Sequence, residues 1–400
     1  MLRSYLHFAR RHRKGLLFGA LLMALSSFGQ TYYVSLFGAD FRKTFGLSDG
    51  TLGAAYAIGT VASALTLTWA GRLIDLTTVR RYTWCVAALL AAACLLTAGA
   101  GSVLVLAVAF YFLRLGGQGL MMHTALTATA RAYPEDAGKA LGIASLGFSA
   151  AQAALPPLAV LLLAAIGWRW TWAAGAAAVL AGTALALAFL PRPVDEAGAI
   201  AARRKSLADA PRAALWRDPR MLFTLPAILA APFIGTGFFF HQARLAQEKG
   251  WTLAWIAGWF VVYAVFQAVA QVAIGPIIDR FGARRLMPLF LMPLVVSMAA
   301  LWLSNSIWAA PVYLITIGLS AAVASTLATA LWVELYGPAL LARVRSAVEA
   351  ALVVASGASP IVMGFLIDWG VPLRDQAAAC MIYALIASGL ATRIPARKAA

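Results

Sequence analysis

Arg114 lies in the middle of an apolar run, where a charged side chain is costly to place. The run begins near Val103, so at 1.5 Å of helix rise per residue Arg114 lies roughly 16 Å along it. A charge at that depth costs at least about 2.5–3.5 kcal/mol and marks a functional site by default. A guanidinium can bind a carboxylate through two parallel hydrogen bonds, so Arg114 is suited to binding an anion. The other interpretation is a structural strut, neutralised by neighbouring carbonyl groups.

Polar side chains recur at helical spacing in five other apolar runs, near residues 26–33, 56–63, 145–156, 263–271 and 325–332. Buried glutamines need hydrogen-bonding partners, so several such stripes favour one shared polar pathway over separate helix contacts. The residues that we expect to bind a ligand are Arg114, Gln118, Gln30, Tyr33, Gln152, Tyr263, Gln267, Gln271 and Trp332.

Two further residues are candidates for binding a coupling proton. His241 lies in the outer half of its apolar run, and Glu349 lies roughly 6 Å inside another. A phosphate-binding loop of the Walker type does not occur in the sequence, so ATP is not expected to drive the protein. Neither a metal-ligand spacing nor a nucleophile with its base is found, so we expect no metal, no cofactor and no enzyme activity.

Composition identifies the elements that must position these residues. The chain is 62% hydrophobic and 12% charged, whereas soluble domains carry roughly 25% charged residues. Runs long enough to cross a bilayer as helices recur along it. The fold class that we predict is an all-α membrane protein with twelve spans, near residues 16–38, 51–72, 82–100, 103–130, 139–166, 170–190, 221–247, 252–277, 286–304, 308–335, 346–367 and 376–394.

The basic residues predict the orientation. With the N-terminus placed inside, 25 of the 32 Lys and Arg residues fall on the inner side, so both termini are predicted to be cytoplasmic. This distribution explains the net charge of +17 without a nucleic-acid partner. The polar stretch 191–220 divides six spans from six, giving bundles 1–190 and 221–400 joined by a cytoplasmic linker. We expect a multi-pass protein of the bacterial inner membrane, a monomer whose partners are the lipid bilayer, a small-molecule substrate and a coupling proton.

A short pattern occurs twice, the second copy 204 residues after the first. A repeat of this length points to two equivalent halves. The copies lie at the predicted cytoplasmic ends of spans, where Gly71 and Gly275 leave room for a close helix approach. There an ion pair such as Asp75 with Arg131, or Glu334 with Arg284 or Arg285, can form and break. The predicted gate residues are Gly71, Asp75, Arg80, Arg81, Arg131, Gly275, Asp279, Arg280, Gly282, Arg284, Arg285 and Glu334.

This pattern resembles the signature loop of the major facilitator superfamily, roughly Gly-x-x-x-Asp-Arg-x-Gly-Arg-Arg. The second copy, from Gly275 to Arg285, matches well, whereas the first has Leu76 and Thr78 where Arg and Gly are usual. Residues 142–169 and 332–337 also resemble the branch of monocarboxylate and oxalate carriers. The resemblance implies two pseudo-symmetric six-helix bundles around a central site.

The sequence therefore predicts a secondary active transporter that works by alternating access. We expect its substrate to be a small organic anion, resembling a monocarboxylate, held by Arg114. One alternative is proton-coupled efflux of drugs or metabolites, which the aromatic residues of the polar stripes would suit. An alternative of a different class is a receptor or scaffold without transport activity.

Overall fold

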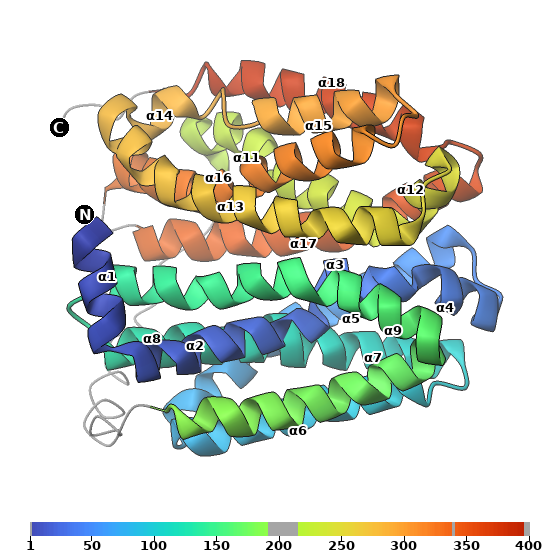
Figure 1. Cartoon of the computed structure of the whole chain (residues 1–400). Helices are drawn as coiled ribbons and strands as arrows, with labels where there is room; N and C mark the ends of the chain where they lie inside the picture. The colour runs from blue at the N-terminus through green and yellow to red at the C-terminus, as the bar shows by residue number, and fades with distance from the viewer. Residues whose placement is uncertain (1, 191–214, 338–340, 396–400) are drawn as a thin grey trace. The chain divides into compact units, whose positions relative to one another are not determined.

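The computed structural model of the chain describes residues 2–190, 215–337 and 341–395, and these form helices joined by short connections (Figure 1). Most of the predicted linker at 191–220 lies outside the described residues. Two compact units are present. The first comprises Met1–Asp40 with Ile58–Asp209, and the second comprises Phe41–Ala57 with Ala210–Ala400. Residues 41–57, which follow the first predicted span, therefore belong to the second unit.

The first unit is built from α1 (Leu2–Arg11), α2 (Arg13–Leu25), η1 (Ser26–Gly29), α3 (Thr31–Val34), η2 (Ser35–Phe37), η3 (Gly71–Asp75), α6 (Val79–Ala98), α7 (Val103–Leu113), η4 (Arg114–Met121), α8 (Met122–Ala132) and α9 (Ala137–Ala188). Two helices pass from one unit into the other, α4 (Gly38–Phe45) and α5 (Asp49–Ala70). The second unit contains η5 (Leu215–Arg217), α11 (Pro219–Phe240), α12 (Gln242–Lys249), α13 (Leu253–Phe281), α14 (Ala283–Leu286), α15 (Met292–Leu303), α16 (Ala309–Tyr336), α17 (Leu341–Asp368) and α18 (Leu373–Ala391).

The described residues hold eight helices that are long and apolar enough to cross a membrane. A ninth span is obtained if Arg13–Gly29 and Thr31–Phe45, which meet at a 48° bend, count as one. The predicted fifth and sixth spans form the single element α9, whose helix is interrupted at Gly167 with φ 75°. The predicted ninth span corresponds to α15, which has only 12 residues. The number twelve therefore stays a prediction.

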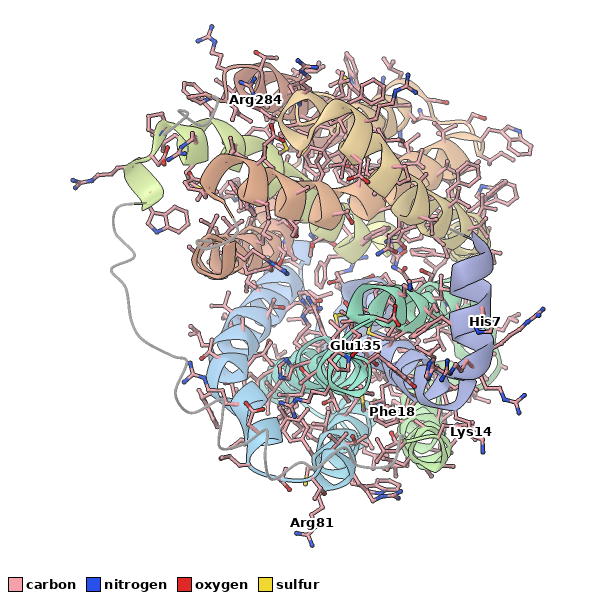
Figure 2. All side chains as sticks on the ribbon, turned by 90° about the vertical axis from the view of Figure 1, so that its left-hand side faces the viewer. His7, Lys14, Phe18, Arg81, Glu135 and Arg284 are labelled. Carbon is pink, nitrogen blue, oxygen red and sulfur yellow. The ribbon has the colours of Figure 1, made fainter. Side chains whose placement is uncertain are left out.

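Close packing of α2 on α9 organises the first unit, in which the long helices lie side by side while α1 crosses their ends (Figure 1). Gly147 permits this contact, because a Cβ atom there would lie 1.9 Å from the carbonyl oxygen of Ala20. Figure 2 shows these helices end-on. Lys14 and Arg81 extend away from the unit, whereas Phe18, only 1% exposed, lies among the helices.

Charged side chains secure several helix ends in the second unit. Asp218 caps α11 by accepting a 2.8 Å hydrogen bond from the backbone N–H of Arg220, whose guanidinium pairs with the same carboxylate. Burial alone would raise the pKa of Asp218, but the hydrogen bonds from Arg220 outweigh it and lower that pKa below its ordinary value. Glu248 accepts hydrogen bonds from the first two N–H groups of α18, and the Lys249 ammonium donates to carbonyl groups at the end of α15.

Candidate functional site

Arg114 lies at the place where the first span is broken. The helix formed by α2 and η1 ends at Gly29, and Gln30 adopts an extended conformation with φ −86° and ψ 148° before α3 begins. Arg114 is 4% exposed, and its Nη1 donates to the carbonyl oxygen of Gly29 at 3.2 Å and to the hydroxyl of Thr31 at 3.4 Å. A guanidinium therefore joins the fourth predicted span to both sides of the break.

Small residues bring the two backbones together. Arg114 starts η4, a π-helical segment, and such segments are frequent at functional sites. An added Cβ at Gly29 would lie 2.0 Å from the carbonyl oxygen of Leu113, and one at Gly117 would lie 2.6 Å from the Cα of Gly29. Any larger side chain at either glycine would separate the helices, so these glycines set the distance between Arg114 and the break.

Three glutamines predicted to bind a ligand have buried amide atoms without a hydrogen-bond partner in the described structure. They are Gln30 with its Nε2, and Gln118 and Gln152 with their Oε1. Gln30 lies within the break, Gln118 is one turn beyond Arg114, and Gln152 comes from α9, which packs on η1. Each such atom costs about 1–3 kcal/mol until something polar satisfies it. A polar ligand near Arg114 would do so.

Tyr33, also predicted to bind the ligand, belongs to an aromatic cluster instead. The centroid of its ring lies 5.1–5.5 Å from those of Phe28, Phe37 and Trp172. The ring is 3% exposed. Packing of this kind stabilises the fold of the first unit through aromatic contacts.

The second unit contains a cavity of about 340 Å³ between α11, α16 and α17, lined also by Phe290 and Leu294. Its lining is mostly apolar. Of the predicted residues, Trp332 and Glu349 line it, with Arg345 beside Glu349. Ser320, 1% exposed, also lines it, and its hydroxyl finds no partner among the described residues. Apolar pockets with a few polar groups are the usual form of a small-molecule site.

The other residues of the second unit that were predicted to bind a ligand lie on α13. Tyr263 is buried against Phe239 and Phe260. One turn later, Gln267 has a buried Oε1 without a partner in the described residues, and Gln271 is exposed. None of the three lines the cavity described above.

The first signature loop contains the predicted ion pair. The guanidinium of Arg131 donates to the carboxylate of Asp75, with both side chains about one third exposed. Arg80 donates to the carbonyl oxygen of Leu187, and the backbone N–H of Arg81 donates to the Thr78 hydroxyl, which caps α6. This loop is therefore joined to α8 and α9.

The second loop has a different backbone at the position of Thr78. Gly282 has φ 80°, which ends α13, whereas Thr78 has φ −72° and caps a helix instead. Glu334 accepts a 3.1 Å hydrogen bond from the backbone N–H of Arg284, whereas the Arg284 guanidinium donates to the carbonyl oxygen of Ile394. Arg284 is labelled in Figure 2. Asp279, Arg280 and Arg285 are exposed.

The prediction that Gly71 and Gly275 allow a close helix approach is wrong. An added Cβ at Gly275 would meet nothing within 4 Å, and one at Gly71 would make only ordinary contact with His123, 3.5 Å away. Neither glycine faces a neighbouring backbone closely. In the first unit the close approaches lie at Gly29, Gly117 and Gly147.

His241, a predicted coupling residue, lies at the junction of α11 and α12 and faces Asp49 at the start of α5. Sequence reasoning missed Asp49, Thr31, Ser320 and Asp368. A Ser-Asp-Gly-Thr run at residues 48–51 signals a helix start, and it gave no indication of a partner on α11 or α17.

Comparisons with known proteins agree with this architecture. A sequence model of the Major Facilitator Superfamily matches residues 19–261 and again residues 242–400. The crystal structure of a bacterial homologue of the human lysosomal transporter Spinster, inward-facing and occupied, has a TM-score of 0.72 at 15% identity, covering 95% of this chain and 96% of that chain. The nucleoside transporter NupG has a TM-score of 0.71 at 13% identity, covering 95% and 97%.

Identities this low show a shared fold and nothing more specific. A search of curated protein sequences gave no match. The structural neighbours are transporters, and the family match extends over more than half of the sequence. The arginine at the broken helix and the two signature loops thus belong to a transporter fold, and the chain is a member of the Major Facilitator Superfamily.

Proposed function

We propose that this chain is a secondary active transporter of a small organic anion, which Arg114 binds during alternating access. The observation that carries the proposal is the position of Arg114 at the break of the first span. Broken helices at the level of the membrane midplane form the substrate sites of many secondary transporters. The guanidinium places a buried positive charge beside the break, and its planar shape matches the geometry of a carboxylate.

The unsatisfied amides support a polar substrate. The Gln30 Nε2 can donate to a carboxylate close to the Arg114 contacts, whereas the Oε1 atoms of Gln118 and Gln152 can accept from a hydroxyl or N–H group of the same substrate. The resemblance to the monocarboxylate and oxalate branch favours the same substrate class. As part of the same proposal, the chain has twelve spans in two six-helix halves, and both termini are cytoplasmic.

Efflux of an amphipathic compound is the second candidate, and the cavity in the second unit favours it. An apolar lining with Trp332, the Ser320 hydroxyl and the charged pair of residues on α17 would suit a solute with a ring system and one polar group. In this case a proton gradient would drive export.

An uptake screen in proteoliposomes distinguishes the two. The panel comprises labelled monocarboxylates, dicarboxylates, nucleosides and amphipathic cations, each with and without a pH gradient. We expect saturable uptake of at least one organic anion, which the other anions inhibit. Accumulation of the amphipathic cations alone would favour efflux. Absence of transport in every arm would favour a receptor or scaffold.

The ion pair of Asp75 with Arg131 is proposed to act as a gate. Solvent-accessible ion pairs such as this one, about one third exposed, contribute only about 0–1 kcal/mol to stability, so Asp75→Asn should leave the melting temperature nearly unchanged. If the pair biases the conformational equilibrium, the same variant slows uptake several-fold while substrate affinity stays the same. The measurement is the initial uptake rate beside equilibrium binding. Exchange of the two residues, Asp75→Arg with Arg131→Asp, should restore the rate, and an equal loss of binding and uptake would contradict the gate.

A further inference from the structure

Asp49 is the centre of a charged cluster in the second unit. This first residue of α5 forms an ion pair with Arg42 of α4, and the Nε of Arg244 on α12 lies 3.9 Å from its second oxygen. The Nδ1 atom of His241 lies 3.6 Å from Asp49 Oδ1. The Asp49 side chain is 11% exposed and that of His241 is 2% exposed, so their interaction is little screened by water.

The second ring nitrogen of His241 fixes how the imidazole is protonated. Its Nε2 lies 3.0 Å from the carbonyl oxygen of Pro360 on α17. A carbonyl oxygen only accepts hydrogen bonds, so Nε2 must carry a hydrogen. In a neutral imidazole, Nδ1 would then present its lone pair to the carboxylate of Asp49. Only the doubly protonated ring donates toward both oxygens, so this geometry fits one additional proton held between His241 and Asp49.

The surrounding charges keep that proton exchangeable. Arg42 and Arg244 both attract the Asp49 carboxylate and so weaken its hold on a third cation. Asp368 of α17 opposes this effect with a second carboxylate next to the cluster, where it accepts hydrogen bonds from the Asp49 N–H at 3.1 Å and the Gly50 N–H at 2.9 Å.

Three other charged residues of α4 and α12 are exposed or make their contacts elsewhere. Lys43 is exposed, Glu248 caps α18, and Lys249 donates to the end of α15. They therefore do not contribute directly to the environment of the imidazole.

The cluster sits where the start of α5 packs tightly. An added Cβ at Gly53 would lie 2.3 Å from the same Pro360 oxygen that His241 contacts, and one at Gly364 would lie 2.5 Å from the Asp49 carbonyl oxygen. The rings of Tyr56 and Phe240 are 4.6 Å apart. With backbones this close, a change in the contact between His241 and Asp49 is transmitted directly to the packing of residues 41–57.

We propose that His241 and Asp49 form a proton-binding site, and that the bound proton holds residues 41–57 against α11 and α17. When the proton leaves Nδ1 for water, the donor toward Asp49 is lost and the segment loosens. Histidine is the side chain whose charge ordinarily changes between pH 5 and 8. Because His241 lies in the predicted outer half of its span, the pH outside the cell would control the packing of this segment. The proton site itself does not depend on the function proposed above; only the consequence of proton binding for transport rests on it.

Histidine NMR tests the proton site without any substrate. The chain has four histidines, so ¹⁵N-histidine labelling of the full-length protein gives few imidazole signals, and His241→Gln assigns the relevant one. We expect doubly protonated His241 at pH 5 and its titration toward pH 8. Asp49→Asn removes the attracting charge and should lower the fraction of doubly protonated His241 at a given pH.

A matched control is available in the first unit. His123 Nε2 also lies close to a backbone carbonyl oxygen, that of Gly71 at 3.1 Å, and its titration should be unaffected by Asp49→Asn. A singly protonated His241 at every pH from 5 to 8 would overturn the proposal, as would a titration that Asp49→Asn does not move.

Hydrogen exchange tests the effect on the segment. After correction for the intrinsic pH dependence of exchange, protection of the amides of residues 48–57 should fall about tenfold between pH 5 and pH 8 in the unmodified protein. His241→Gln keeps a neutral side chain throughout and should remove this dependence, whereas His123→Gln should not. Equal protection at both pH values would refute the proton-dependent contact. Because neither measurement needs a substrate, its failure would leave the Arg114 hypothesis unaffected.

Discussion

Replacement of Arg114 by alanine is expected to weaken binding of an organic anion at least about 10-fold, because each charge-assisted hydrogen bond contributes roughly 1.5–3 kcal/mol. Arg114→Lys should recover only part of the affinity. Lysine keeps the charge but lacks the planar fork that holds a carboxylate through two hydrogen bonds. The measurement is isothermal titration of purified protein with the anions that the uptake screen identifies.

The two contacts of Arg114 require a control for stability. Arg114→Ala leaves the carbonyl oxygen of Gly29 without this donor, which costs about 1–3 kcal/mol, so some loss of melting temperature is expected. Thr31→Val removes the other contact and leaves the charge in place. It should lower the melting temperature while keeping anion affinity. If folded Arg114→Ala protein binds the anion as well as the unmodified protein does, Arg114 is only a strut.

The second large effect that we expect is a loss of stability when Gly147 is replaced by alanine. In Gly147→Ala the new methyl carbon would lie 1.9 Å from the carbonyl oxygen of Ala20, and backbone cannot move aside as a flexible side chain can. Overpacking ordinarily costs about 1–3 kcal/mol, and the shortness of this contact places the variant at or above the upper end. Thermal unfolding in detergent, together with the yield of monodisperse protein, measures the effect.

Gly142 supplies the matched control, because it lies on the same helix and an added Cβ there meets nothing within 4 Å. Gly142→Ala should be neutral or slightly stabilising, since alanine favours a helix over glycine by about 1 kcal/mol. Equal melting temperatures for the two variants would contradict the described packing of α9 on α2.

Local features of the sequence singled out Arg114 and the pair of Asp75 with Arg131, whose contacts the structure shows. A charge inside an apolar run is unusual by itself, so Arg114 stood out without any knowledge of its neighbours. The pair of Asp75 with Arg131 followed from opposite charges at the predicted cytoplasmic ends of neighbouring spans. The repeated loop gave the family, because its glycine, aspartate and arginines recur in the same order.

Features that depend on distant partners were not predictable. The break at Gln30 is stabilised by Arg114, and the approach of Gly29 to Gly117 has no signature beyond two glycines in different spans. Asp49 and His241 are far apart in the sequence. His241 was a candidate coupling residue by itself, but Asp49 has an ordinary local explanation as a helix-start residue, so the pairing of the two was not predictable. The error at Gly71 and Gly275 has the same origin, since a glycine alone does not reveal what approaches it.

Counterflow in proteoliposomes tests the central claim most directly. Vesicles loaded with an unlabelled organic anion are diluted into the labelled anion without any ion gradient, so accumulation requires a carrier that exposes one site alternately to both sides. We predict transient accumulation above equilibrium for the unmodified protein and for Gly142→Ala, and none for Arg114→Ala. If no anion of the screen shows counterflow while a neutral or cationic solute does, the assignment of an anionic substrate to Arg114 is contradicted.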